Sequence, residues 1–132
     1  MILLDTHALV WVLEDSPKLG RRAASIANRA LRQDRLWISA VTFWELSLLI
    51  DRNRIRLTVS PEEFRSRVQG LGIQEAPVTG DIAIAAARLS VSLKDPADCF
   101  MAATAMLEHG KLMTADDRLL DAGVGDVVDA RL

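Results

Sequence analysis

The first eleven residues, MILLDTHALVW, constrain the fold more than any other stretch of the chain. Ile2–Leu4 form a short uninterrupted apolar run, which is typical of a strand buried on both faces of a parallel sheet. The run ends at Asp5, and apolar residues then recur at helical spacing from Ala8 to Leu13. A carboxylate at such a junction lies at the carboxyl edge of the sheet, where open α/β proteins bind ligands. The junction is equally compatible with Asp5 serving only as the N-cap of the helix.

The rest of the chain continues the alternation of strands and helices. Short apolar runs predict further strands at 36–38, 73–78, 111–114 and 127–128. Helical spacing and capping residues predict helices at 17–31, 40–50, 61–70, 80–93, 96–109 and 116–122. Ser16 and Pro17 have the residue types of a helix start, with serine as the N-cap and proline at the first helical position. The alternation predicts an α/β fold whose parallel sheet is covered on both faces.

Composition places the chain among soluble globular proteins. Of its 132 residues, 50% are hydrophobic and 26% are charged, which suits a single domain spanning 1–132 with a real core. The only cysteine, Cys99, excludes an internal disulfide and fits a reducing compartment. No apolar run approaches the ~18 residues that span a bilayer, and the N-terminus has no leader pattern. We therefore expect a cytoplasmic protein without a membrane partner.

The net charge of −2 conceals an asymmetry along the chain. Eleven basic and nine acidic residues precede Asp81, whereas five basic and nine acidic residues follow from it. Most of the bases are arginine, including the run Arg52, Arg54 and Arg56, and arginine suits bidentate contacts to phosphate. Any one of these arginines is also explained by a solvated helix face. The charge therefore neither requires nor excludes a nucleic-acid partner.

Glu45 is the most informative of the other carboxylates. Its neighbours three and four residues away are mostly apolar, so its side chain is predicted to face inward. A buried carboxylate costs several kcal/mol unless it is paired or binds metal. The alternative is a capping box formed with Thr42, which requires the helix to begin there. Ser39 is the better start because it ends the preceding strand, and this favours a functional role for Glu45.

Two more acids follow predicted strands or begin the helices after them. Asp98 falls in the first turn of a helix, where the helix dipole stabilises an acid by ~0.3–1 kcal/mol. Its inward neighbours are apolar, so it can also point at the sheet edge. Asp116 follows the strand at 111–114 and can equally cap the next helix. Asp95 is explained as the N-cap before Pro96, and we assign it a structural role.

Four carboxylates at one sheet edge would repel one another, and a divalent cation removes that conflict. Ligation by oxygen atoms alone selects a hard ion such as Mg²⁺ or Mn²⁺. Zinc is not expected, because His7, His109 and Cys99 lack the spacing of metal ligands. The predicted site therefore consists of Asp5, Glu45, Asp98 and Asp116.

Four segments of the chain together resemble a PIN domain, with the VapC-type toxins of bacterial toxin–antitoxin pairs as the nearest group. The segments are MILLDTHALVW, ISAVTFWELSLL, DPADCFMAATAM and LMTADDRLL, and they occur in the family's order and spacing. The resemblance implies a three-layer α/β/α fold with a central parallel sheet of about five strands. It also places the family's acidic quartet on the four carboxylates named above, and the small hydroxyl residues beside the site on Thr6 and Thr114. Cys99 departs from the pattern, because relatives often carry arginine there.

The resemblance further implies a Mg²⁺- or Mn²⁺-dependent endoribonuclease whose cognate antitoxin occludes the site. Metal-assisted hydrolysis would leave 5′-phosphate and 3′-hydroxyl ends without using the RNA 2′-hydroxyl or a histidine. Arg52, Arg54 and Arg56 are candidates for guiding the RNA backbone. The apolar faces of 43–50 would suit a homodimer or a toxin–antitoxin hetero-oligomer. Two alternatives stay open: a PIN-fold binding protein that cleaves nothing, and a housekeeping RNA-processing nuclease outside any toxin pair.

Two unrelated classes of α/β protein with clustered acids fit less well. A phosphoacceptor receiver domain needs an acid pair after its first strand and a lysine after its last core strand. Here Thr6 follows Asp5, and Lys111 precedes its strand. A phosphatase with an aspartate nucleophile usually has the pattern Asp-x-Asp, and position 7 is histidine.

Overall fold

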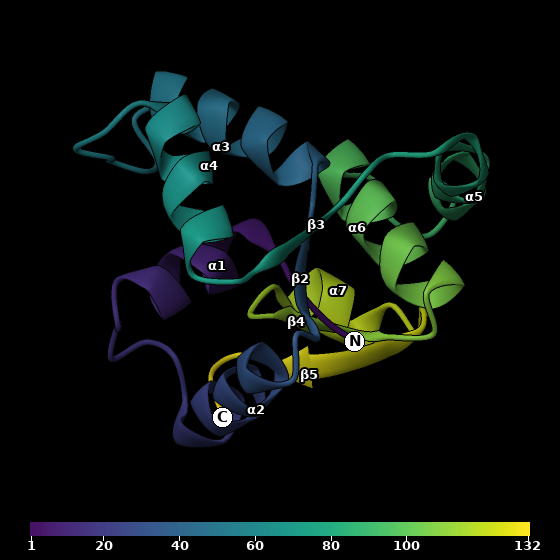
Figure 1. The fold of residues 1–132 in the computed structure, drawn as a ribbon. Coiled ribbons are helices and arrows are strands. Elements are labelled where there is room, and N and C mark those ends of the chain that lie inside the picture. The colour runs from purple at the N-terminus through teal and green to yellow at the C-terminus, as the bar shows by residue number, and fades with distance from the viewer.

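A computed structural model describes residues 1–132 and contains one five-stranded sheet whose strands are all parallel. The strand order is β3-β2-β1-β4-β5, so β1 lies in the centre and β3 and β5 form the two edges (Figure 1). The strands are β1 (Ile2–Leu4), β2 (Leu36–Ser39), β3 (Gln74–Ala76), β4 (Lys111–Thr114) and β5 (Asp126–Asp129). This arrangement confirms the predicted parallel α/β sheet.

Seven helices cover the two faces of the sheet and complete a three-layer α/β/α fold. They are α1 (Thr6–Leu13), α2 (Arg21–Arg32), α3 (Val41–Asp51), α4 (Pro61–Gly70), α5 (Gly80–Leu89), α6 (Pro96–Leu107) and α7 (Asp117–Asp121). Residues of α1–α4 pack into one hydrophobic core, and residues of α5–α7 pack into the other. Figure 1 shows α1 and α4 on one side of the sheet and α5 and α6 on the other. No helix has the length and apolar composition that crossing a bilayer requires.

The central strand β1 is buried on both faces, as its apolar run predicts. Leu4 belongs to the core under α1–α4, whereas Leu3 belongs to the core under α5–α7, and neither is exposed. Leu4 pairs with Ile38 of β2 and with Met113 of β4. Because the strands are parallel and in register, the residues that follow these three emerge at the same edge of the sheet. That edge begins with Asp5.

Two predicted helix boundaries are wrong. Ser16 and Pro17 do not start a helix: the Ser16 hydroxyl accepts the Lys18 N–H at 3.2 Å within a turn, and α2 begins only at Arg21 after an extended Gly20. The helix predicted to reach 93 ends at Leu89. There the Ser90 hydroxyl donates to the Ala87 carbonyl oxygen at 2.6 Å, which gives the backbone a local alternative to the helix. Elsewhere the predicted elements agree with the structure to within a few residues, with Lys111–Thr114 matched at both ends.

Gly20 begins α2 because the C-terminal residues pack directly against it. The Leu132 carbonyl oxygen accepts the N–H groups of Arg22 and Ala23 at 2.9 and 3.1 Å, which satisfies two free donors at the start of the helix. A Cβ atom at Gly20 would overlap the backbone of Leu132. The glycine therefore allows the C-terminal segment to cap α2.

We expect Gly20→Ala to lower the free energy of unfolding by about 1–3 kcal/mol, because backbone atoms must move to relieve the overlap. Gly70→Ala is the matched control: no atom lies within 4 Å of its added Cβ, so this change should be neutral or stabilising by up to about 1 kcal/mol. Urea denaturation measures both values. Equal stability of the two variants would show that the packing at Gly20 does not hold in solution.

Candidate active site

Asp5 is the buried centre of the acidic edge, with only 7% of its surface exposed. Its Oδ1 atom accepts the Ala8 N–H at 2.8 Å, so the residue does cap α1. Its Oδ2 atom accepts a short hydrogen bond from the hydroxyl of Thr114. Capping therefore occupies one carboxylate oxygen and fixes the direction of the other. The two interpretations of Asp5 left open by the sequence are compatible.

Thr114 links the ends of two strands. Its Oγ1 atom donates to Asp5 and accepts the Asp116 N–H at 3.0 Å. Thr114 is fully buried at the end of β4, next to β1 in the sheet. This chain of hydrogen bonds sets the position of Asp116 relative to Asp5, so Thr114 acts as a positioning residue for both carboxylates.

Glu45 reaches the same edge from α3. The helix begins at Val41, whose N–H donates to the Ser39 hydroxyl at 3.1 Å, so Thr42 is not the N-cap that a capping box requires. The capping-box alternative is therefore excluded, and the Thr42 hydroxyl is buried without a hydrogen-bond partner. The Glu45 carboxylate is partly buried near Asp5, Thr6 and His7.

Asp95 and Asp98 bring two further carboxylates from the start of α6. Asp95 caps this helix through Oδ1, which accepts the N–H groups of Ala97 and Asp98 at 2.9 and 3.3 Å. Carboxylate oxygens of Glu45, Asp95 and Asp98 nevertheless lie within 4.8 Å of one another. The sequence predicts only a capping role for Asp95; the structure confirms that role and also places Asp95 in the acidic cluster.

Asp116 completes the edge after β4 and combines both roles left open by the sequence. Its Oδ1 accepts the Arg118 N–H at 2.9 Å as the N-cap of α7. The guanidinium of Arg118 also donates to both carboxylate oxygens, at 3.2 and 3.0 Å. These hydrogen bonds lower the pKa of Asp116. Asp117, by contrast, is exposed and pairs with Arg131 at 2.8 Å.

A single cavity of about 670 Å³ collects these carboxylates. Asp5, Glu45, Asp95, Asp98 and Asp116 all line it. The other lining residues are His7, Trp11, Leu49, Arg54, Ala115, Asp117, Arg118 and Arg131. The structure thus brings all four sequence-predicted carboxylates together and adds Asp95 and Asp117, of which Asp117 is already paired with Arg131.

Of the three arginines singled out in the sequence, only Arg54 lines this cavity. Arg56 lines a separate pocket beside α4, and Arg52 lines neither pocket. The Cys99 side chain faces the second core, where its thiol donates to the Leu93 carbonyl oxygen at 3.2 Å. Position 99 therefore offers no contact to a ligand in the cavity.

Crowding of negative charge perturbs the cluster. Burial raises the pKa of Asp98 to about 7, and the carboxylates of Asp95, Asp116, Glu45 and Asp5 act in the same direction. Burial also raises the pKa values of Asp5 and Glu45, against the stabilising hydrogen bonds that Asp5 accepts. Such a cluster favours binding of protons or of a cation.

The donor set fits a divalent cation. The carboxylate oxygens of Glu45, Asp95 and Asp98 converge, and the buried Thr6 hydroxyl lies beside Glu45. Oxygen donors of this kind are those that hard divalent ions prefer. The acidic group can therefore hold a divalent metal ion.

We expect the metal-free protein to lose stability as the pH rises from about 4 to about 7, because Asp98 has a pKa of about 7 in the folded state and an ordinary value when unfolded. The folded protein then binds more protons than the unfolded chain, so the free energy of unfolding falls with pH. Solvent reaches Asp98, and we expect its contribution to be about 1–2 kcal/mol. Denaturation in EDTA across this range measures the slope. Asp98→Asn should flatten it, and an unchanged slope in that variant would contradict the assignment.

Comparisons with known proteins agree with the fold. The family model described as PIN domain matches residues 2–124. Ribonuclease VapC22 of Mycobacterium tuberculosis (strain ATCC 25618 / H37Rv) is 32% identical over 124 residues, covering 89% of this chain and 88% of the relative. The chain belongs to the PIN domain family.

Solved structures show the same fold at lower sequence identity. A toxin–antitoxin complex from Klebsiella pneumoniae contains a chain that superposes with a TM-score of 0.63 at 24% identity, with 98% of each chain covered. The structure of FitAB bound to the IR36 DNA fragment gives a TM-score of 0.70 at 23% identity, covering 100% of this chain and 96% of the other. These likenesses confirm the three-layer α/β/α fold.

Proposed function

We propose that this protein is a metal-dependent endoribonuclease that hydrolyses RNA phosphodiester bonds, acting as the toxin of a toxin–antitoxin pair. The observation that carries the proposal is the convergence of Asp5, Glu45, Asp95, Asp98 and Asp116 on one cavity at the carboxyl edge of the sheet. The 32% identical relative is named a ribonuclease, which supports the substrate class. The preferred ions are Mg²⁺ and Mn²⁺, because every donor of the cluster is an oxygen.

Different residues of the chain would have different roles at this site. Glu45, Asp95 and Asp98, whose oxygens lie within 4.8 Å of one another, would hold the cation together with Asp5. When bound, the ion would supply positive charge to the phosphodiester and lower the pKa of a water molecule. Thr114 would orient Oδ2 of Asp5, and the Thr6 hydroxyl would lie beside Glu45 at the edge of the cation site. Asp116, held by Arg118, would complete the acidic wall.

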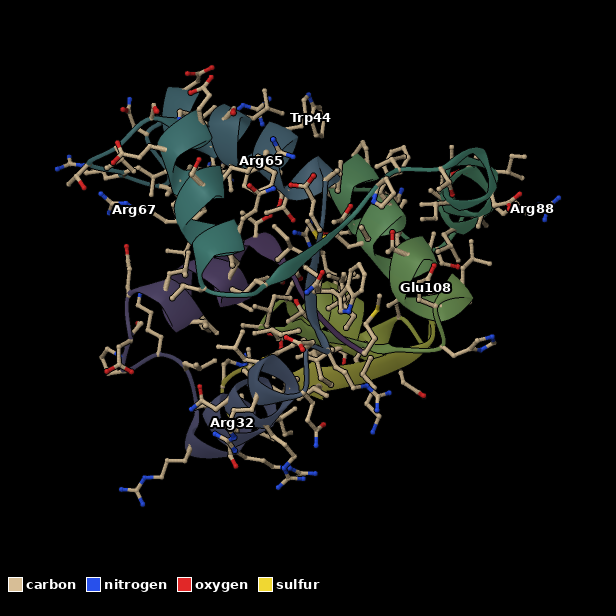
Figure 2. All side chains as sticks on the ribbon, in the orientation of Figure 1. Arg32, Trp44, Arg65, Arg67, Arg88 and Glu108 are labelled. Atoms are coloured by element: carbon tan, nitrogen blue, oxygen red, sulfur yellow. The ribbon has the colours of Figure 1, made fainter.

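We infer that the partner is a cognate antitoxin protein, in a homodimer or a toxin–antitoxin hetero-oligomer. The solved structures that share the fold include a toxin–antitoxin complex, which supports this assignment. Trp44 on α3 is 51% exposed and lies at the outer surface of the molecule, where a partner can cover it (Figure 2). Site occlusion by the partner implies that activity is measured best on partner-free protein.

The experiment is incubation of a mixed pool of tRNA and rRNA with partner-free protein in Mn²⁺ or in EDTA. The proposal predicts metal-dependent cuts with 5′-phosphate and 3′-hydroxyl ends. Cyclic-phosphate ends or full activity in EDTA would contradict it. A protein that binds metal but cuts no RNA would instead be a binding protein of the PIN fold.

Among the three candidate arginines, Arg54 should matter most, since it alone lines the acidic cavity. We expect Arg54→Gln to lower kcat/KM for RNA by about 5- to 10-fold and to reduce its dependence on salt, because one contact to phosphate is lost. Arg52→Gln removes the same charge from the same loop and should change little. Initial rates at several salt concentrations measure the difference. Equal effects of the two changes would show that the loop acts only through its net charge.

A further inference from the structure

A second charged cavity lies on the face of the sheet next to α2 and has the opposite sign. It measures about 560 Å³ and lies between α2, the starts of β1 and β4, and the length of β5. Arg22, Arg35, His109 and Lys111 line it, above a floor that includes Ile2, Ile26, Val127 and Val128. A smaller cavity of about 210 Å³ shares Ile2, Ile26 and Arg35 with it and adds Arg29. We call the two together the basic groove.

The cations of the basic groove are available to a ligand. Arg22, Arg29, Arg35 and Lys111 are exposed, and none of them forms an ion pair within the protein. The one acidic side chain in the groove, Asp129, is already bound by Arg131 at 2.9 Å. The other ion pairs of the protein involve Arg65, Arg67, Arg118 and Arg131, none of which lines the groove. The groove therefore presents uncompensated positive charge.

The basic groove adjoins the acidic cavity. Asp129 lines the groove and Arg131 lines the acidic cavity, and these two side chains are bonded to each other at the end of β5. From that ion pair the groove follows the edge strand β5 toward Lys111 at the opposite end of the sheet. There the backbone of Lys111 in β4 lies beside that of Asp126 in β5. A linear ligand bound in the acidic cavity can thus continue into the groove.

We propose that the basic groove binds the phosphodiester backbone of the RNA strand that flanks the cleavage site. Arg22 and Arg29 are two turns apart on α2, about 10 Å along its axis, which allows contacts to successive phosphates. Arginine suits phosphate because its guanidinium donates two parallel hydrogen bonds. The groove has no tryptophan, tyrosine or phenylalanine on which a base can stack, so we expect binding to depend mainly on the backbone and little on sequence. This inference rests on the proposed function, since that function places RNA in the adjoining cavity.

The test uses two triple variants with the same net charge. Arg22→Gln/Arg35→Gln/Lys111→Gln removes three cations from the groove. Lys18→Gln/Arg32→Gln/Arg88→Gln removes three exposed cations elsewhere, and Figure 2 shows Arg32 and Arg88 projecting outward from α2 and α5. All six side chains are exposed, so both variants should fold, which circular dichroism checks.

Binding of a labelled single-stranded RNA of about 20 nucleotides, longer than a typical single-strand site, is measured in EDTA by fluorescence anisotropy over a range of salt concentrations. We expect the groove variant to bind about 10-fold more weakly and to lower the salt slope by about 2, since each phosphate contact of a single strand contributes about 0.7. The control variant should stay within about twofold of wild type, apart from long-range effects that salt screens. Equal binding by the two variants would overturn the proposal. Tighter binding of polyglutamate than of RNA at the groove would also overturn it, in favour of an acidic protein segment.

A cleavage assay in Mn²⁺ separates this proposal from the nuclease assignment. For the long RNA, the groove variant should have a higher KM than wild type and the same kcat. For a short RNA that cannot reach the groove, the variant and wild type should cut equally well. If wild-type protein binds RNA through the groove but cuts nothing, the nuclease assignment fails and the proposed RNA-binding role of the groove stands. If wild-type protein cuts RNA and the groove variant binds and cuts like the control variant, only the proposed role of the groove fails.

Discussion

Replacing Asp5 by asparagine is expected to lower RNA cleavage by about 1,000-fold or more, because the residue is the buried anionic centre of the proposed metal site. The fold should survive the change. Asparagine is as good an N-cap as aspartate, so the hydrogen bond from the Ala8 N–H is retained. Loss of one negative charge also relieves repulsion within the cluster, and the melting temperature without metal should be unchanged or higher.

Rates for wild type and Asp5→Asn are compared with Mn²⁺ present, and partner binding is measured on the same preparations. Asp126→Asn is the matched control, because Asp126 is an exposed acid at the other end of the sheet and lines neither cavity. This control should cut like wild type. Cleavage by Asp5→Asn at the wild-type rate would show that the carboxylate cluster takes no part in the reaction.

Thr114→Val should reduce activity by about 10- to 100-fold, the range typical of residues that orient metal ligands. Valine keeps the shape of the side chain but leaves Asp5 Oδ2 without its donor and the Asp116 N–H without its acceptor. A lost hydrogen bond to a buried charged group costs about 1.5–3 kcal/mol, so the melting temperature should fall as well. Thr114→Ser retains the hydroxyl and should recover most of the activity.

A second readout distinguishes positioning from a loss of stability. Affinity for Mn²⁺, measured well below the melting temperature of each variant, should fall in Thr114→Val and return in Thr114→Ser. Wild-type metal affinity in Thr114→Val would show that the hydroxyl supports the fold without orienting Asp5.

The sequence predicted the sheet well because its strands are short apolar runs that end at polar residues. Leu36–Ser39 and Lys111–Thr114 are strands of this kind, and their ends lie beside Asp5 in the structure. The start of α2 was predicted wrongly, because its cap comes from the C-terminal residue Leu132, more than a hundred positions away. Local patterns such as Ser16-Pro17 contain no information about that contact.

The carboxylates illustrate the same limit at the site. The sequence predicts a functional role for Glu45, because an acid on an apolar helix face is costly unless it is paired or binds metal, and the structure places Glu45 in the cluster. In the sequence, capping explains Asp95 fully, but in the structure capping uses only Oδ1 and its second oxygen is free for another role. An N-cap at the carboxyl edge of a sheet can therefore serve the helix and the site together. Such a position in a sequence is worth treating as a candidate ligand.

A calorimetric titration of partner-free protein with Mn²⁺ tests most directly whether these carboxylates form one divalent cation site. The structure predicts saturable binding by wild type and by Asp126→Asn, and binding at least about 10-fold weaker in Glu45→Gln and Asp98→Asn, which each lose a carboxylate of the cluster. Equal affinity in all four proteins, or no saturable binding by wild type, would show that no such site forms.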